Sequence, residues 1–465
     1  MRSFKDFVQS KSILEQSENK EKKDWKKQFV KLEKGFIPPS NMKPVIQAFL
    51  NSNSISIMND TSKELNMPKK SLYLTGGSVR DFLKNKTPKN FNLATNATPE
   101  QTARILSDFG FKSSENEDFD FGFEAELASE GNEKTWFVSD SDSKGKPLAI
   151  TALVRGDKFE ISTFLKELES KEVEYTDDIE EDAKRRDISI NSLYIELSKP
   201  DGENNKLYDP TKHGWYDITQ GNINVLGNPE KRFEEDPLRM MRVVRFHSQY
   251  GKGEISKDII RAIKELRSDI SGVPLEKAKE EFIKGLTHPD IDPKVYLQNY
   301  SRTNIINQLF PNVNLSLDVP SNFSNKKDKS LALAWILQDN SIEDIESVLS
   351  SKNTKGEDTG WTDQERNAVV FLLKLKEFDV DNLDELIDQK KYTALSPEQI
   401  MNWVELFEIN GRNSRPQWAK LIKSFCKFTP DYSKLYKTND GSNINIVKYI
   451  NKERLKNMFS DFSKY

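Results

Sequence analysis

The chain carries its clearest signal in two neighbouring runs, Tyr73-Leu74-Thr75-Gly76-Gly77-Ser78-Val79-Arg80-Asp81-Phe82-Leu83 and Lys89-Asn90-Phe91-Asn92-Leu93-Ala94-Thr95-Asn96-Ala97-Thr98-Pro99-Glu100. Residues 71–75 alternate apolar and polar side chains, as a half-buried strand does. Gly76-Gly77 lets the backbone turn sharply, and Arg80-Asp81 open a short amphipathic helix. Such a turn can present amide N–H groups to a phosphate, although taken alone it is more often an ordinary tight turn.

Three later runs add charged residues in regular patterns. Residues 159–164 read Phe159-Glu160-Ile161-Ser162-Thr163-Phe164, a strand-like alternation with a single acid. The other two runs read Ile179-Glu180-Glu181-Asp182-Ala183-Lys184-Arg185-Arg186-Asp187-Ile188-Ser189-Ile190-Asn191-Ser192-Leu193-Tyr194 and Leu226-Gly227-Asn228-Pro229-Glu230-Lys231-Arg232-Phe233-Glu234-Glu235-Asp236-Pro237-Leu238-Arg239-Met240-Met241-Arg242-Val243-Val244-Arg245-Phe246.

This ordered series closely resembles the class II (bacterial-type) CCA-adding tRNA nucleotidyltransferases and their sister bacterial poly(A) polymerases. The resemblance covers about residues 70–290 and is faint elsewhere. It implies an α+β fold, in which a polymerase-beta-like nucleotidyltransferase head with a mixed sheet is followed by an all-helical neck, body and tail. It also implies nucleotide addition to RNA 3′ ends without a nucleic-acid template.

The chemistry of that reaction explains why carboxylates are expected in the first motif. Nucleotidyl transfer places charge on phosphate oxygens, and two Mg²⁺ ions supply most of the stabilisation. An Asp-x-Asp on one strand points two carboxylates to the same side, which suits this hard cation. Here those positions are Asn90 and Asn92, while Glu160 matches the third carboxylate of the family. The predicted metal and catalytic positions therefore keep their shape and lose two charges.

The two amides admit more than one explanation. They are either polar loop residues, deliberate Asp→Asn changes that trap a substrate, or a natural loss of catalysis with binding retained. If Asn90 and Asn92 are the metal positions, we expect transfer slower by several orders of magnitude, since removing one stabilising group costs ~10²–10³-fold. The other motifs stand intact, which argues for retained binding of nucleotide or RNA.

The second motif, Arg185-Arg186-Asp187 followed by Asn191, matches the family's ribose and triphosphate contact. Arginine presents a fork suited to phosphate oxygens, and an aspartate can accept from a ribose hydroxyl. Residues 184–187 are alternatively a solvated charged patch at the start of a strand.

The third motif contains Asp236 and Arg239, which share one face of a helix because they lie three residues apart. A carboxylate and a guanidinium can imitate a Watson–Crick edge, so this pair can select CTP and ATP through their exocyclic amines. The alternative is a helix start, with Asp236 as N-cap and Pro237 in the first turn.

Arginines recur every three residues through Arg239, Arg242 and Arg245, a row that suits a triphosphate or an RNA backbone, while Met241, Val244 and Phe246 are expected to face inward. The predicted nucleotide-binding residues are Gly76, Gly77, Arg80, Arg186, Asp187, Asn191, Asp236, Arg239, Arg242 and Arg245.

Composition narrows the class of protein. The net charge of −4 excludes a globally basic RNA coat, so RNA contacts must use local basic patches. One cysteine, Cys426, forbids an intrachain disulfide, and the three histidines show no zinc spacing (His213, His247, His288). No apolar run is long enough to span a membrane, the longest candidate being residues 331–337. We expect a cytoplasmic protein without a signal peptide.

The domain organisation follows from charge and periodicity. We expect a charged helical extension at 1–66, a head at 67–220 with an insertion or loop at about 113–146, a helical neck with base recognition at 221–290, and a helical body and tail at 291–465 that could bind RNA. Helices are predicted at about 42–51, 275–286, 329–337, 365–378, 397–407 and 417–428.

The preferred function is CCA addition to tRNA from CTP and ATP, with Mg²⁺ as a cofactor that is weakened or absent if the amides are native. Poly(A) addition fits almost as well, but poly(A) polymerases often carry a strongly basic C-terminal tail that this chain lacks. A third hypothesis is a non-catalytic RNA- or nucleotide-binding protein on the same scaffold. The expected partners are a tRNA or other RNA 3′ end with ATP and CTP, without a membrane; the sequence does not indicate the oligomeric state.

Overall fold

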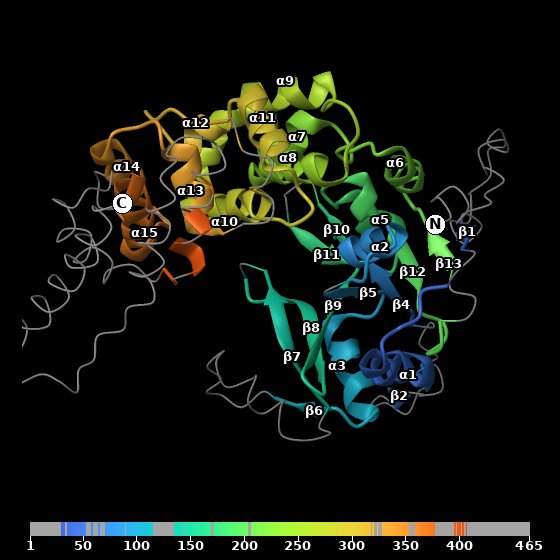
Figure 1. Cartoon of the computed structure of the whole chain (residues 1–465). Coiled ribbons are helices and arrows are strands. Elements are labelled where there is room, and N and C mark those ends of the chain that lie inside the picture. The colour runs from blue at the N-terminus through green and yellow to red at the C-terminus, as the bar shows by residue number, and fades with distance from the viewer. Residues whose placement is uncertain are drawn as a thin grey trace, which may run out of the picture. The chain divides into compact units, whose positions relative to one another are not determined.

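The structure is a computed structural model, and it divides into two compact units. The first contains Met1–Glu235 and Tyr250–Lys252, and the second contains Asp236–Gln249 and Gly253–Tyr465. Figure 1 follows the chain by colour. The residues that the structure describes are 29–32, 35–52, 57–58, 64–65, 70–88, 90–114, 134–142, 144–168, 172–202, 206–317, 319, 323, 328–352, 359–376, 395–396, 398–400, 402–403 and 406.

A mixed sheet forms the centre of the first unit, and its described strands number nine, in the order β1-β13-β12-β4-β5-β9-β8-β7-β6. Only the β5–β9 and β6–β7 neighbours within it are parallel. The strands are β1 (Phe29–Lys31), β4 (Leu72–Thr75), β5 (Phe91–Thr95), β6 (Lys112–Ser113), β7 (Lys134–Ser141), β8 (Pro147–Val154), β9 (Asp157–Thr163), β12 (Tyr194–Glu196) and β13 (Lys206–Tyr208). Short pairs lie outside it: β2 (Ile57–Met58) with β3 (Glu64–Leu65), and β10 (Leu165–Glu167) with β11 (Val173–Tyr175).

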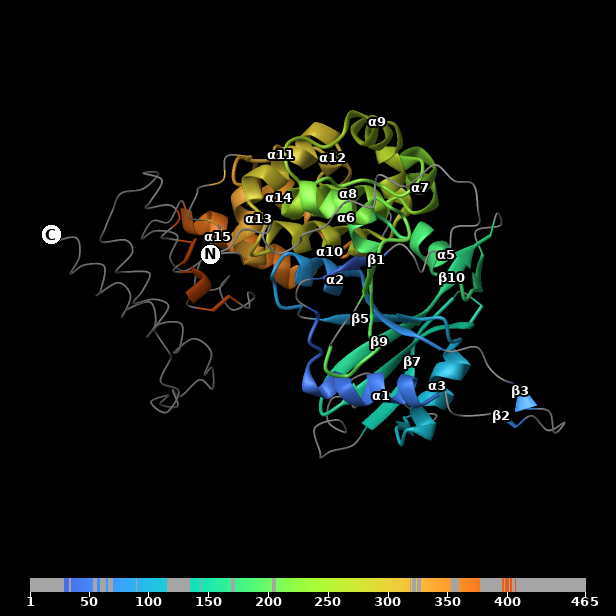
Figure 2. The ribbon, with the colours of Figure 1, turned by 90° about the vertical axis from the view of Figure 1, so that its right-hand side faces the viewer.

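Helices pack on this sheet at positions that local sequence explains. The glycine turn leads directly from β4 into α2, which packs on β4 and β5. Thr98 and Gln101 form a capping box at the start of α3, where Pro99 occupies the first turn. Figures 1 and 2 both show α1 and α3 together at one side of the sheet. The helices of this unit are α1 (Lys43–Asn51), α2 (Gly76–Leu83), α3 (Pro99–Asp108), α5 (Ile179–Lys184), α6 (Gly214–Gln220) and α7 (Pro229–Glu235), with the 3₁₀ turns η4 (Ser40–Met42) and η6 (Ser189–Asn191).

An aromatic cluster holds the middle of the sheet together. The ring of Tyr73 lies 5.7 Å from that of Phe164, 6.2 Å from that of Tyr194 and 6.0 Å from that of Tyr208. All four side chains are buried. Burying one such ring contributes roughly 1.5–3 kcal/mol, so the cluster fixes how β4, β12 and β13 sit on the segment that follows β9.

The second unit consists of helices. Helix α13 is buried on every side from Leu331 to Leu337, and Trp335 packs near Trp403 and Phe323. The helices are α8 (Leu238–Tyr250, whose last residue belongs to the first unit), α9 (Lys257–Leu266), α10 (Leu275–Leu286), α11 (Pro293–Thr303), α12 (Ile306–Leu309), α13 (Lys329–Leu337), α14 (Ile342–Val348) and α15 (Asp363–Lys376), with the 3₁₀ turn η7 (Arg267–Gly272).

The α+β class expected from the resemblance is confirmed, since a mixed-sheet unit is joined to a helical one. The helices predicted at 42–51, 275–286 and 329–337 form within one residue of those bounds, and the one predicted at 365–378 spans Asp363–Lys376. The helix predicted at 417–428 lies outside the described residues. Within the helix predicted at 397–407, the described residues 398–400, 402–403 and 406 are helical. Searched over the described residues, no helix is long and apolar enough to cross a membrane.

Two segments differ from expectation. Within the extension predicted to be helical, Phe29–Lys31 forms strand β1, which pairs with β13. Within the segment predicted to be an insertion or loop, Lys134–Ser141 forms strand β7, which pairs with β8 along most of its length. This strand contains four residues of types that favour strands, Thr135, Trp136, Phe137 and Val138. The polar residues on both sides made the whole segment resemble a loop in the sequence.

Candidate nucleotide site

Asn90, Asn92 and Glu160 lie together at the surface of the sheet. In the parallel pairing of β5 with β9, Asn92 is directly opposite Glu160, so the two side chains share a face. Asn90 stands two residues before Asn92 and therefore points to the same side. All three residues are exposed. The structure thus brings together the three positions that the sequence predicted for metal binding.

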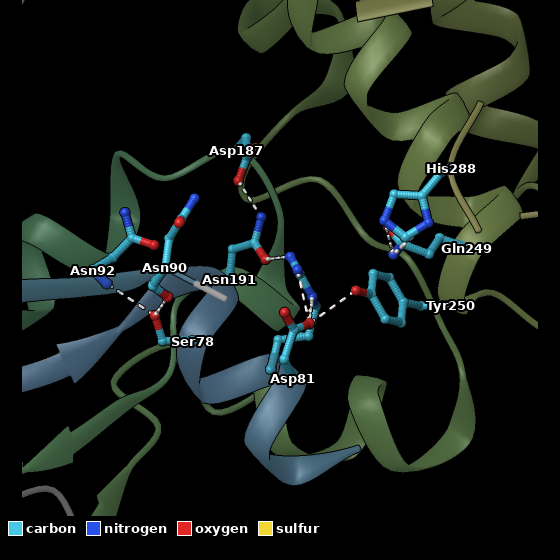
Figure 3. Close-up of polar contacts among 10 residues, drawn as sticks. Ser78, Asp81, Asn90, Asn92, Asp187, Asn191, Gln249, Tyr250 and His288 are labelled. Atoms are coloured by element: carbon cyan, nitrogen blue, oxygen red, sulfur yellow. Dashed lines mark hydrogen bonds and ion pairs between the residues drawn. The ribbon is translucent and has the colours of Figure 1, made fainter. Parts of the chain in front are cut away.

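A buried serine fixes the backbone of this pair. Ser78 lies in the first turn of α2 and is 1% exposed. Its hydroxyl donates to the carbonyl oxygen of Asn90 at 2.8 Å and accepts from the backbone N–H of Asn92 at 2.9 Å. Figure 3 shows the hydroxyl of Ser78 bonded to the backbone of both asparagines. The motif is therefore held in one conformation by groups that do not depend on its own charge.

The donor set does not fit two Mg²⁺ ions. Glu160 offers one carboxylate, whereas the side chains of Asn90 and Asn92 offer neutral amide oxygens that cannot offset the charge of a cation. Although Glu160 is exposed at the surface of the sheet, neighbouring protein atoms desolvate its carboxyl group and raise its pKa, and the carboxylate of Asp140 raises it further. Among the described residues, no group of three or more His, Cys, Asp or Glu side chains could hold a metal ion. We derive no reaction step through magnesium for the chain as it stands.

The glycine turn brings Arg186 close to the amide pair. Gly76 has a φ of +61°, a conformation that favours glycine. A β-carbon at Gly76 would lie 3.6 Å from Nη1 of Arg186 and 4.0 Å from the β-carbon of Asn92. Residues from α2, β5 and the turn after α5 therefore converge at one point.

Asp182 holds Arg186 at that point. Its Oδ2 accepts from Nη2 of Arg186 at 3.0 Å and from the hydroxyl of Tyr194 at 2.6 Å, and Nε of Arg186 donates to that hydroxyl at 2.8 Å. Although burial alone would raise the pKa of Asp182, Arg186 and Arg185 hold it below its usual value. The carboxylate therefore stays charged at neutral pH and orients the guanidinium.

Arg80 was predicted to contact nucleotide directly, but its guanidinium is occupied by the protein. It is 9% exposed, and its Nη1 donates to Oδ1 of Asn191 at 2.9 Å. Its Nε and Nη2 donate to Asp81. A β-carbon at Gly77 would lie 3.2 Å from Nη2 of Arg80, so glycine leaves room for this packing. Arg80 therefore acts as internal support in this structure.

The third motif lies at the start of α8 in the second unit. Asp236 caps the helix, since its Oδ1 accepts from the backbone N–H of Leu238 at 3.0 Å. Its Oδ2 lies 3.7 Å from Nη1 of Arg242. Asp236, Arg239 and Arg242 are half-buried. The capping predicted as an alternative is thus present, and it leaves the second carboxylate oxygen near Arg242.

Arg245 does not continue the arginine row as predicted. It is 6% exposed, and its Nε donates to Oε1 of Glu281 at 2.5 Å inside the helical unit. The side chains of Met241, Val244 and Phe246 are buried, as expected. A three-residue spacing advances by about 300° on a helix, so a row of arginines drifts around it until the third member meets the core.

Two of the three histidines, for which the sequence predicted no zinc site, make contacts within the second unit. His247 is buried, and burial lowers its pKa. His288 contacts the side-chain amide of Gln249, whose nitrogen lies 3.0 Å from Nε2. Cys426 lies outside the described residues. Sequence reasoning missed Ser78, Asp81, Asp182 and Tyr250 as supports of the site; the first three lie inside the matched motifs, while Tyr250 carries no sequence signal.

The chain is similar in sequence to proteins of known function. A sequence profile of the poly A polymerase head domain matches residues 72–122 and 108–224. The chain is therefore related in sequence to CCA-adding enzymes and bacterial poly(A) polymerases. A CCA-adding enzyme of Lactobacillus helveticus (strain DPC 4571) is 28% identical over 343 residues, which cover 72% of this chain and 67% of that enzyme. Poly(A) polymerase I of Escherichia coli O157:H7 is 29% identical over 254 residues, 53% of this chain and 47% of that enzyme.

Solved structures of the family share the fold. The Thermotoga maritima CCA-adding enzyme complexed with tRNA superimposes with a TM-score of 0.52 at 16% identity, covering 91% of this chain and 95% of that one. A CCA-adding enzyme in complex with CTP gives a TM-score of 0.52 at 15% identity, covering 90% and 92%. By sequence, the chain spans about half the length of most of the curated relatives it matches.

Proposed function

We propose that this chain is a template-independent RNA 3′-end nucleotidyltransferase of the CCA-adding type, whose metal-binding pair carries amides in place of carboxylates. The observation that carries the proposal is that Asn92 lies directly opposite Glu160 and close to Asn90. The hydroxyl of Ser78 holds the backbone of both asparagines through two hydrogen bonds. The arrangement is that of a metal motif, and only its charge is missing. Such a site binds substrates and transfers slowly or not at all.

The nucleotide would lie over the glycine turn. Arg186 faces Gly76 with its guanidinium oriented by Asp182, which suits the oxygens of a triphosphate. Asp187, on the same turn, would accept from a ribose hydroxyl and so prefer a ribonucleotide. Binding of the triphosphate would depend on Arg186, and recognition of the ribose would depend on Asp187. Neither contact needs a carboxylate at position 90 or 92.

Base selection would fall to Asp236 and Arg239 at the start of α8. The carboxylate can accept from the exocyclic amine of cytosine or adenine, and the guanidinium can donate to a ring nitrogen or a carbonyl. Uracil and guanine place an acceptor where those bases carry the amine. The pair therefore favours CTP and ATP, and CTP is the nucleotide bound in a solved CCA-adding enzyme that shares this fold.

Two alternatives have support of their own. Poly(A) addition is favoured by the likeness to poly(A) polymerase I and by the head-domain profile. A non-catalytic RNA- or nucleotide-binding protein is favoured by Asn90 and Asn92 themselves. The CCA assignment is preferred because relatives of both the sequence and the fold include CCA-adding enzymes, one of them solved with tRNA.

The test restores carboxylates at positions 90 and 92 and identifies the nucleotides that the variant adds to an RNA 3′ end. A labelled tRNA lacking its 3′ CCA is incubated with Mg²⁺ and each single NTP, then with CTP and ATP together, for the native chain and for Asn90→Asp/Asn92→Asp. The matched control is Asn51→Asp/Asn85→Asp, which adds the same charge at exposed positions elsewhere in the first unit.

Addition of C, C and A by the restored variant alone supports the proposal. Long A tracts on any RNA identify a poly(A) polymerase instead. Binding of tRNA without extension by either chain overturns the enzyme assignment and leaves an RNA-binding protein.

A further inference from the structure

Tyr250 contacts the two residues at the centre of α2. It is 8% exposed and belongs, with Lys252, to the first unit. Its hydroxyl donates to Oδ1 of Asp81 at 2.9 Å, and Cζ of Arg80 lies 4.5 Å from the centre of its ring. Burial raises the pKa of Tyr250 to about 12, so the hydroxyl remains a donor at neutral pH. Tyr250 thus holds Arg80 from one side while Asp81 holds it from another.

From Arg80 a continuous chain of hydrogen bonds reaches Asp187. Nη1 of Arg80 donates to Oδ1 of Asn191 at 2.9 Å, and Nδ2 of Asn191 donates to Oδ1 of Asp187 at 3.2 Å. Figure 3 shows this chain running from Tyr250 through Asp81 and Asn191 to Asp187. The residues that it joins lie as far apart in the sequence as Asp81 and Tyr250, which are separated by 169 positions.

The donors and acceptors in this series of hydrogen bonds are fixed. A guanidinium can only donate, so Arg80 forces the oxygen of the Asn191 amide toward itself and the NH₂ group toward Asp187. Oδ1 of Asp187 also accepts from the backbone N–H of Ile188 at 2.8 Å. No hydrogen bond within the described part of the chain falls on Oδ2 of Asp187, which leaves that oxygen for a ligand.

We infer that Tyr250 is a positioning residue for ribose recognition by Asp187, acting through Arg80 and Asn191. The inference rests on the proposed function, since it assumes that Asp187 accepts from a ribose hydroxyl. If the hydroxyl of Tyr250 is lost, Oδ1 of Asp81 loses a donor that orients it, so Asp81 holds Arg80 less firmly against the Asn191 amide. An amide that turns its oxygen toward Asp187 repels the carboxylate and displaces the oxygen that meets the ribose.

A tyrosine with a purely structural role provides the matched control. The hydroxyl of Tyr208 donates to Oε2 of Glu196 at 2.8 Å, and its ring packs in the aromatic cluster of the same unit. Tyr208→Phe therefore removes a tyrosine–carboxylate hydrogen bond of the same kind. None of the described hydrogen bonds of Tyr208 leads to Asp187.

The experiment compares affinities for ATP and dATP by isothermal titration calorimetry of the full chain. We expect Tyr250→Phe to lower the preference for ATP over dATP by about threefold to tenfold, because a hydrogen bond to a carboxylate is involved and part of its effect is transmitted. Tyr208→Phe should leave the preference at the native value. Asp81→Asn is a second variant that loosens Arg80 by another route, and it should lower the preference in the same way.

A double-mutant comparison separates positioning from general loosening. In an Asp187→Ala background, Tyr250→Phe should have no further effect on the ATP to dATP ratio. A native preference that both Tyr250→Phe and Asp81→Asn retain would overturn the inference alone. Equal affinity of the native chain for ATP and dATP would overturn both the inference and the ribose contact on which it rests.

Discussion

Replacing Ser78 by alanine is expected to release the backbone of the amide pair. The change removes two hydrogen bonds, 2.8 Å to the carbonyl of Asn90 and 2.9 Å from the N–H of Asn92. Each such bond contributes about 0.5–1.5 kcal/mol, so the local cost is about 1–3 kcal/mol. Through the Boltzmann factor this free energy corresponds to about 5-fold to 150-fold faster opening of the segment.

Hydrogen–deuterium exchange of the full chain measures this opening directly. The peptide that contains Asn92 should exchange faster in Ser78→Ala by a factor in that range, while peptides from the helical unit should be unchanged. Thr219→Ala is the control, since it removes an exposed hydroxyl hydrogen bond to the carbonyl of Tyr216 in the same unit. If the peptide that contains Asn92 exchanges at the native rate in Ser78→Ala, the hydrogen bonds of Ser78 do not hold this backbone, and this expectation is refuted.

Other substitutions test the supports of the site. Because the folded-state pKa of Asp182 is depressed, its contribution to stability is present above the unfolded pKa of about 3.9 and is lost as the pH falls through the folded-state value. Asp182→Asn should cost about 3–5 kcal/mol at pH 7 and flatten acid destabilisation in urea titrations; a steep native-like acid dependence would contradict this. Gly76→Ala should cost about 1 kcal/mol because its φ of +61° strains an alanine, and it should weaken ATP binding by shifting the turn that faces Arg186. Calorimetry measures the affinity, and a native value would contradict a role for this turn in ATP binding. Arg245→Ala should cost about 3–5 kcal/mol, whereas Arg245→Met/Glu281→Met should be near neutral in urea titrations, and neither should change ATP affinity.

The sequence predicted the metal-motif positions because strand periodicity is local. Asn90 and Asn92 share a face by their spacing alone, and an alternating pattern marked Glu160 as a strand residue. Their adjacency depends on parallel pairing of β5 with β9, which no local pattern encodes and which the family resemblance supplied. The resemblance therefore predicted that these three positions lie together, but the sequence did not predict the register in which β5 pairs with β9.

The sequence does not reveal the tertiary contacts that decide what a charged side chain does. Arg80 and Arg245 look alike in the sequence to arginines that bind phosphate, but each is buried against a carboxylate. Tyr250 gave no signal because its partner Asp81 lies 169 positions away. Strand β1 was missed because a short edge strand forms only where its partner β13 is already in place.

The most direct test of the central claim is the single-turnover rate of nucleotide transfer with saturating CTP and a tRNA acceptor. Asn90→Asp/Asn92→Asp should exceed the native rate by at least ~10³-fold, since two groups that stabilise the transition state are restored and each contributes ~10²–10³-fold. The affinity for CTP in the absence of metal should stay within about threefold of the native value, because the nucleotide contacts are unchanged. Equal rates for the two chains, with both binding tRNA, would contradict the claim that only charge is missing from this site.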